Sequence, residues 1–385
     1  MNACGTLIMV SMIYRWKFLV AVLSFAVGMG AWRSTAFAQA PPVRVVIVGL
    51  EHGHVAGFLN AFPKQHDVEL VGIVDADEAL RAKYEQQFNL DPSLLYARLD
   101  DAIAARHPQA VLVYTPISEH LAVIQDAAAH GLDVMVEKPL TLSVGDALAI
   151  RKAAREHHIH VMVNYETTWY ASNRALYEMA EQGRLGVIRR VVIHDGHQGP
   201  QEIGVQPEFL KWLKDPAENG AGALYDFGCY GADLMTWLMH GQAPLSVTAV
   251  AHTDKPAEYA PVDDDATIVL QYPGAQAVLM PSWNWTFARK DMTIYGTKGY
   301  ATAVNASEVR TRFAENAPEQ IETAAPLTPP EDTSLHYLAA VVRGELDPEG
   351  DLTALDTNIV VMQILDAARE SAHWGRTVVL HPLPQ

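Results

Sequence analysis

The sequence predicts an α/β protein with a doubly wound parallel sheet in its N-terminal part and a C-terminal α/β domain with a large, mostly antiparallel open sheet. Two observations carry this prediction. Between residues 43 and 163, short apolar runs alternate with segments of helical length and pattern, which is typical of parallel βαβ units. After residue 188 the strand-like runs are longer and alternate between apolar and polar residues, which is typical of antiparallel strands.

The first strand leads into the most informative turn of the chain. Val45–Val48 are four β-branched residues that run directly into Gly49, and a helical pattern begins at Val55. A Rossmann dinucleotide-binding unit begins in this way, with an apolar strand that ends in glycine and opens a helix. A second apolar strand over 68–74 ends in Asp75, where an acidic residue would meet the ribose hydroxyls of NAD.

The other elements follow in order. In the first domain the pattern predicts strands over 43–48, 68–74, 110–114, 133–137 and 160–163, with helices near 54–62, 77–87, 99–105, 118–130 and 144–157. Further on it predicts strands over 188–194, 246–252, 266–272, 277–282 and 291–295, a helix over 226–239, a surface loop over 315–332 and a helix near 353–372. We therefore expect a Rossmann domain over 43–163, a substrate-binding and oligomerisation domain over 164–350, and a C-terminal helix and tail over 351–385 that pack back on the body.

Polar residues follow the predicted parallel strands, where ligands bind in such sheets. Gly49, Asp75, Thr115, the pair Glu137–Lys138, and Asn164 stand at these positions. A lysine at a strand end, above a cofactor, can hydrogen-bond a substrate hydroxyl and lower its pKa. The alternative for Lys138 is an ordinary surface lysine in a turn.

The glycine fingerprint of the first turn is incomplete. The pattern G-x-G-x-x-G would place glycine at 49, 51 and 54, but the chain has Glu51 and His54. A carboxylate at residue 51 would repel a pyrophosphate, whereas His52 and His54 could donate to its oxygens and Gly53 could offer another turn. The alternative is a tight βα turn without a ligand.

A glycine-rich turn at 220–222 leads into the predicted helix that carries Asp226, Tyr230 and Asp233. Their spacing of i, i+4 and i+7 places them on one helix face, where an acid and a phenol suit proton transfer. The alternative is that Asp226 caps the helix and Tyr230 is a core aromatic residue.

Composition sets the class of protein and its partners. A hydrophobic content of 49% with 19% charged residues is typical of a packed globular protein, and a net charge of −17 argues against nucleic acid or an anionic membrane as a partner. Residues 1–38 have the basic, apolar and small-residue regions of a signal peptide, which predicts an exported, periplasmic or secreted protein with no membrane segment in its mature form; an uncleaved anchor is the alternative.

These stretches, in this order, resemble the Gfo/Idh/MocA family (glucose–fructose oxidoreductase and inositol 2-dehydrogenase) over roughly residues 43–380. Further stretches that carry the resemblance are Thr115-Pro116 with His120, Glu137-Lys138-Pro139, Gly220–Trp237, Asp263–Thr267 and Ile294–Gly299. The resemblance implies hydride transfer between NAD(P) and a sugar, cyclitol or similar hydroxyl, and a homo-oligomer formed through the C-terminal sheet. NAD is favoured over NADP because Asp75 would repel a 2′-phosphate.

Carried over residue by residue, the resemblance implies a catalytic Lys138, a substrate-binding Asp226, and Tyr230 where many members have an acid/base histidine. Because an ordinary tyrosine pKa is about 10, we expect a cation, Lys138, to activate Tyr230. The implied cofactor-binding residues are Gly49, Glu51, His52, Gly53, His54, Asp75, Thr115, Pro116, His120 and Glu137. The substrate candidates are Asn164, Tyr165, Trp169, His194 and His197, with aromatic rings that could stack on sugar faces.

Two further expectations remain at this point. We expect no metal, although His194 and His197 with His52 or His54 form a conceivable metal site, and we expect Trp283 and Trp285 to share one strand face, as sugar-stacking rings or in an oligomer interface. Three functions compete. They are a carbohydrate dehydrogenase that retains its cofactor, an NAD-dependent glycosidase or lyase that oxidises its substrate transiently, and a carbohydrate-binding protein whose cofactor site has decayed.

Overall fold

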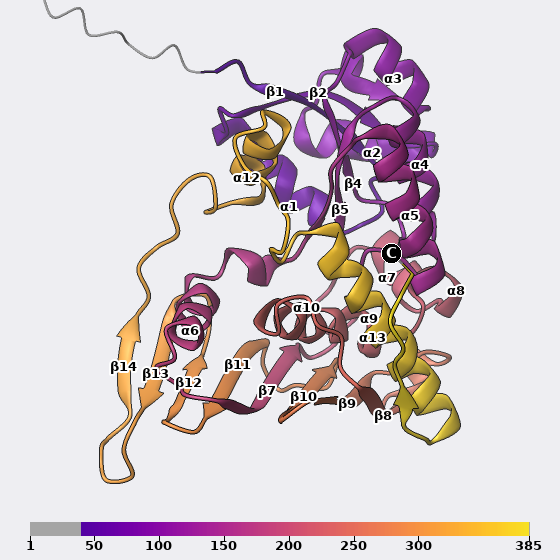
Figure 1. Ribbon diagram of the computed structural model, residues 1–385. Coiled ribbons are helices and arrows are strands. Elements are labelled where there is room, and N and C mark those ends of the chain that lie inside the picture. The colour runs from indigo at the N-terminus through magenta and orange to yellow at the C-terminus, as the bar shows by residue number, and fades with distance from the viewer. Residues whose placement is uncertain (1–39, 385) are drawn as a thin grey trace, which may run out of the picture. The chain divides into compact units, whose positions relative to one another are not determined.

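The computed structural model describes residues 40–384, so the predicted signal peptide over 1–38 lies outside the described residues. Figure 1 shows two sheets, each with its own helices, in the body that begins at Pro41. In this part of the chain, none of the helices is both long enough and apolar enough to cross a membrane.

The first sheet is the predicted doubly wound sheet, and all of its strand pairs are parallel. Its order is β3-β2-β1-β4-β5-β6, which confirms the Rossmann prediction. The strands are β1 (Val43–Val48), β2 (Val68–Val74), β3 (Leu95–Tyr96), β4 (Ala110–Val113), β5 (Asp133–Glu137) and β6 (Val161–Asn164). The central strands β1, β4 and β5 are buried on both faces along almost their whole length, as their continuous apolar runs require.

Five α-helices connect these strands close to the predicted positions. They are α1 (His54–Ala61), α2 (Glu78–Phe88), α3 (Leu99–Arg106), α4 (His120–Ala129) and α5 (Val144–His157). Side chains cap two of these helices at their N-termini. Asp77 accepts hydrogen bonds from the backbone N–H groups of Ala79 and Leu80 at α2, and Ser143 accepts one from the backbone N–H of Asp146 at α5.

The second sheet has nine strands in the order β14-β13-β12-β11-β7-β10-β9-β8-β15. The pair β7–β10 is parallel and the other pairs are antiparallel, which confirms a mostly antiparallel sheet. The strands are β7 (Ile188–Gly196), β8 (Ser246–His252), β9 (Asp265–Tyr272), β10 (Ala275–Ser282), β11 (Arg289–Gly296), β12 (Tyr300–Ala303), β13 (Glu308–Arg312), β14 (Gln320–Thr323) and β15 (Val378–Val379). The loop predicted over 315–332 is wrong in part, because β14 lies within it.

The helix predicted over 226–239 is confirmed from residue 228, but Asp226 belongs to a separate short helix and does not share a helix with Tyr230. α9 (Ala223–Asp226) ends before Phe227, and α10 (Gly228–Leu238) follows with every residue buried. The other helices are α6 (Ala171–Glu181), α7 (Pro207–Leu213), α8 (Pro216–Asn219), α11 (Pro256–Tyr259), α12 (Ser334–Val342) and α13 (Leu355–Trp374). In Figure 1, α6, α10 and α13 lie on one face of the nine-stranded sheet.

Two C-terminal helices join the halves of the body. α12 packs its apolar side chains into the same core as β1 and β2 of the first sheet. α13 contacts α5 of the first domain and both α10 and β8 of the second. The described chain is therefore held together by segments that are far apart in sequence.

Candidate active site

The turn between β1 and α1 has the geometry of a ligand-binding turn. Gly49 has φ +89°, and a Cβ on it would lie 2.6 Å from both the backbone N and the Cγ2 of Thr115, so only glycine fits. The Thr115 hydroxyl is buried without a hydrogen-bond partner among the described residues. Asp75, at the end of β2, accepts a hydrogen bond from the backbone N–H of Leu50 at 2.8 Å. An unpartnered hydroxyl beside a glycine that no other residue can replace suits a phosphate or ribose oxygen.

Glu51 is less of an obstacle to an anionic cofactor than its sequence position predicts. Burial, with the neighbouring charges of Glu119, Asp75 and Glu218, raises the pKa of Glu51 to about 7. Near neutral pH the carboxyl therefore carries a proton in a large part of the molecules. A protonated carboxyl does not repel a pyrophosphate, so the residues of this turn fit a dinucleotide.

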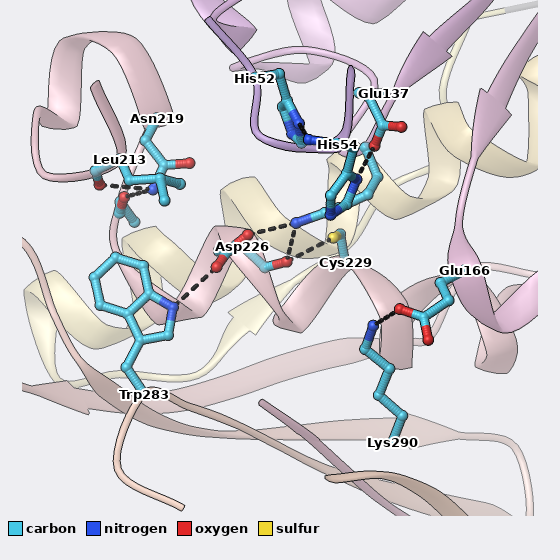
Figure 2. Close-up of polar contacts among 12 residues, drawn as sticks. His52, His54, Glu137, Glu166, Leu213, Asn219, Asp226, Cys229, Trp283 and Lys290 are labelled. Carbon is cyan, nitrogen blue, oxygen red and sulfur yellow. Dashed lines mark hydrogen bonds and ion pairs between the residues drawn. The ribbon is translucent and has the colours of Figure 1, made fainter. Parts of the chain in front are cut away.

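His52 and His54 have different environments. His52 is buried, with ring centroids 4.5 Å from Phe209 and 5.6 Å from Trp212 of α7. Burial keeps the His52 pKa well below its ordinary value, so the ring is neutral. His54 is half exposed, and its Nδ1 lies 3.0 Å from Oε2 of the buried Glu137 (Figure 2).

Lys138 and Asp226 form a buried ion pair between the two domains. The Lys138 Nζ donates to the backbone carbonyl oxygen of Asp226 at 2.9 Å and to its carboxylate Oδ1. The indole N–H of the buried Trp283 donates to Asp226 Oδ2 at 2.9 Å (Figure 2). Burial opposes both charges, but their attraction outweighs it, so the pKa of Lys138 is raised and that of Asp226 is lowered. Both groups are therefore charged at neutral pH.

Tyr230 lies beside this pair, but it is not activated as the sequence predicts. The Lys138 Nζ is 5.3 Å from the Tyr230 ring centroid and the Lys290 Nζ is 4.7 Å from it, so both ammonium groups contact the ring. Burial raises the pKa of Tyr230 well above its ordinary value. The phenol therefore keeps its proton at neutral pH and can donate a hydrogen bond.

A cavity of about 860 Å³ joins these groups, with His54 and Lys138 on its first-domain side and Asp226 and Tyr230 on the other. Tyr170, a predicted sugar-stacking residue, also lines the cavity. Sequence reasoning missed a second set of lining residues, which are Glu166, Phe209, Arg289, Lys290 and Arg310. They come from distant segments that only the tertiary fold brings together. Lys290 pairs with Glu166 across the cavity wall, as Figure 2 shows.

Of the five predicted substrate residues, His197 lines this cavity. The side chains of the other four bond to neighbouring side chains of the protein. Tyr165 is fully buried and its hydroxyl donates to Asn358, while Asn164 donates to Glu137 Oε1 at 3.0 Å and accepts from Trp169. His194 is paired with Asp291 at 2.9 Å.

The structure differs from the sequence prediction at three further positions. His120, predicted to bind the cofactor, is fully buried, with Nδ1 3.1 Å from the carbonyl oxygen of Leu140. The conceivable metal site on His194 and His197 is wrong, because the groups with suitable spacing among the described residues are His52 with His54 and Glu137, and Asp100 with Asp126 and His130. The expectation that Trp283 is a stacking or interface residue is also wrong, because it is buried and bonded to Asp226.

The comparisons with known proteins agree with this geometry. Residues 43–165 match the model described as "Oxidoreductase family, NAD-binding Rossmann fold", and residues 173–302 match the GFO/IDH/MocA C-terminal domain. The chain is 23% identical over 262 residues to trans-1,2-dihydrobenzene-1,2-diol dehydrogenase of Macaca fuscata fuscata, covering 68% of this chain and 73% of that protein. It is 25% identical over 253 residues to inositol 2-dehydrogenase of Rhizobium meliloti (strain 1021), covering 64% and 72%.

A solved structure shows the same fold. The aldose-aldose oxidoreductase from Caulobacter crescentus, complexed with glycerol, superimposes with a TM-score of 0.76 at 23% identity, covering 88% of this chain and 100% of that one. The two matched models span both domains that build the cavity. The chain therefore belongs to the Gfo/Idh/MocA family of oxidoreductases, and its N-terminal domain is the NAD-binding Rossmann domain of that family.

Proposed function

We propose that this protein transfers hydride between NAD(P) and a hydroxyl carbon of a sugar, cyclitol or related carbohydrate. The observation that carries the proposal is the cavity in which Lys138 of the first domain meets Asp226 and Tyr230 of the second. The cavity adjoins the β1–α1 turn through Gly53 and His54, which also line it. A hydroxyl bound there has an ammonium group and a phenol within reach.

The substrate class is inferred from the relatives and from the cavity. The relatives' names specify a diol, an inositol and aldoses, all of which carry several hydroxyl groups. The cavity of about 860 Å³ combines charged groups with the rings of Tyr170, Phe209 and Phe227, which suits the polar edges and apolar faces of a sugar. NAD is preferred over NADP because the carboxylate of Asp75 follows β2.

The ion pair of Lys138 and Asp226 provides the proton that accompanies hydride transfer. A bound nicotinamide supplies a hydride acceptor for alcohol oxidation and a hydride donor for carbonyl reduction. In reduction, the Lys138 ammonium gives its proton to the oxygen as the carbonyl becomes an alcohol, and Asp226 holds Lys138 in place. In oxidation the hydroxyl proton passes to the neutral Lys138 amine that a preceding reduction leaves, which restores the ion pair with Asp226. Tyr230 donates its phenolic proton as a hydrogen bond to the substrate oxygen in both directions.

We extend the proposal to location and cofactor use. The predicted signal peptide supports an exported protein, and a compartment poor in free nucleotide favours a cofactor that stays bound and is recycled by paired oxidation and reduction. N-terminal sequencing of secreted protein tests the export: a start at Gln39 is expected, and a start at Met1 would refute it.

One experiment tests the cofactor. Purified protein is denatured, and the supernatant is assayed for NAD(H) and NADP(H); we expect nucleotide close to one per chain. No nucleotide, together with no thermal shift on adding NAD+ or NADP+, would overturn the proposal in favour of a binding protein.

Turnover separates the two enzymatic alternatives. Oxidation of a free sugar coupled to reduction of a second sugar, or to net NADH, supports the oxidoreductase. Release of an aglycone from a glycoside without net NADH indicates a glycosidase. Lys138→Met removes the ammonium group and should lower kcat by at least about a hundredfold, the usual contribution of a general acid; full activity would remove Lys138 from the mechanism.

A further inference from the structure

The β1–α1 turn and the end of β5 bring together a group of side chains that the proposed oxidoreductase chemistry does not require. One ligand atom each of His52, His54 and Glu137 lies within 4.8 Å of the others. His52 and Glu137 are buried, whereas the side chain of His54 is 48% exposed and lines the large cavity. We propose that these three residues bind one divalent transition-metal ion, such as Zn²⁺ or Co²⁺, with its remaining coordination positions open to the cavity.

The three side chains offer the donor atoms that a divalent transition metal prefers. Two imidazoles and one carboxylate form the protein ligands of several catalytic zinc sites and of non-haem iron sites, which keep further positions open. Nitrogen and oxygen ligands about 2.1 Å from a metal lie about 3.0–3.4 Å from each other. The distance of 3.0 Å between His54 Nδ1 and Glu137 Oε2 already has this value. The metal would take the place of the proton that these two atoms share.

Neighbouring residues hold two of the three ligands in place. Asn164 Nδ2 donates to Glu137 Oε1 at 3.0 Å and fixes the carboxylate, as outer hydrogen bonds do in metal sites. Phe209 and Trp212 pack against the His52 ring and hold it in place. His54 is the exposed member and can turn to shorten the remaining distances.

His54 stands where the dinucleotide-binding pattern has glycine. A dinucleotide turn requires close approach of its backbone, for which glycine at residue 54 would be enough. This chain instead has an imidazole there, paired with a buried carboxylate across the cavity edge. The pair and its neighbour His52 therefore have a geometry that phosphate binding alone does not explain.

The test uses metal alone, without nucleotide or substrate, so its result is independent of the proposed oxidoreductase function. Protein treated with chelator is titrated with Co²⁺, and the visible d–d absorption and the bound metal per chain are measured near neutral pH. We expect one tightly bound Co²⁺ with an absorption typical of four or five ligands, and displacement of Co²⁺ by Zn²⁺.

Three variants locate the site. His54→Ala removes a half-exposed side chain, and Glu137→Gln keeps the shape of the buried one; each should weaken Co²⁺ binding at least about tenfold, the lower end of the loss seen when an outer-shell group is removed. His130→Ala is the matched control, because His130 belongs to an exposed group with Asp100 and Asp126. Circular dichroism verifies the fold of each variant.

The result can contradict the proposal in two ways. Wild-type protein that binds no Co²⁺ overturns it. Co²⁺ binding that survives both His54→Ala and Glu137→Gln, or that is lost with His130→Ala, shows that the metal lies elsewhere and also overturns it.

Discussion

Glu51 stands in the β1–α1 turn with a pKa raised to about 7 by burial and by neighbouring carboxylates. The sign of the resulting pH effect follows from the charge. Below this pKa the side chain is neutral and tolerates a pyrophosphate, whereas above it the carboxylate repels one. We therefore expect the protonation state of Glu51 to affect nucleotide binding.

The affinity for NAD+ should therefore fall as the pH rises through about 7. We expect a loss of about tenfold, equivalent to about 1.4 kcal/mol, measured by calorimetric titration on both sides of neutrality. Glu51→Gln should bind NAD+ with little dependence on pH in this range. A wild-type affinity that is constant or rises with pH would contradict the assignment.

Trp283 and Trp285 are neighbouring tryptophans whose indole N–H groups differ in their hydrogen bonding. Trp283 donates to the buried Asp226 Oδ2, whereas the indole N–H of Trp285 is buried without a partner among the described residues. Trp283→Phe leaves a carboxylate oxygen without its donor, which costs about 1–3 kcal/mol.

Trp285→Phe removes an N–H group that has no bond to lose, so it should change stability by less. Urea unfolding of the two variants measures the difference in the free energy of unfolding. Equal losses would show that the bond between Trp283 and Asp226 contributes nothing.

At the scale of elements, α9 is fixed by a close approach of two backbones. The carboxylate of Asp263 accepts from the backbone N–H groups of Gly222 and Leu224 at 2.9 and 2.7 Å. A Cβ on Gly222 would lie 1.7 Å from the carbonyl oxygen of Asp263. The glycine-rich turn therefore sets where Asp226 ends α9.

Gly222→Ala should lower the melting temperature and the activity together, since the clash moves either α9 or the loop at Asp263. Its control is Gly57→Ala, at an exposed position of α1 where a Cβ meets no atom within 4 Å. That substitution should stabilise the protein by about 0.5–1 kcal/mol, because alanine favours the helix. Thermal unfolding measures both, and a tolerated Gly222→Ala would contradict this account.

The elements that could be predicted are those whose own residues determine them. Buried parallel strands such as β1 are continuous apolar runs, so their positions follow directly from the sequence. The edge strand β14 is exposed at all four residues and has no apolar alternation to detect. The break between α9 and α10 at Phe227 contains no proline and depends on packing, which the sequence does not reveal.

The same distinction applies to the cavity. Lys138, Asp226 and Tyr230 could be found because they stand beside strand ends and in a glycine-rich motif. Lys290 and Arg310 could not, because the strand order of the nine-stranded sheet, and no local pattern, brings β11 and β13 to the site.

At the scale of the whole molecule, the nine-stranded sheet has one face covered by helices and one face free in the described chain (Figure 1). Register places a row of uncharged β-branched residues across the free face, each partly or fully exposed. The row consists of Thr248, Val269, Val278, Val192 and Thr293. Because this row of residues is uncharged on a protein of net charge −17, we expect identical chains to associate through this sheet.

Val278→Glu, at the centre of the row, should convert the expected oligomer to a monomer. Trp374→Glu is the control, because Trp374 is an exposed apolar residue at the end of α13. Light scattering coupled to size exclusion gives the mass of each species. A monomeric wild type, or an oligomer that persists in Val278→Glu, would exclude this interface.

The buried ion pair between Lys138 and Asp226 also governs how the two lobes can separate. The lobes can part only if this pair breaks, and water then solvates both charges, which offsets part of the lost attraction. We therefore expect a small sugar to exchange through the mouth of the cavity faster than the larger dinucleotide, whose release would require the lobes to part. Slow release of the dinucleotide is the expected consequence of this link between the lobes.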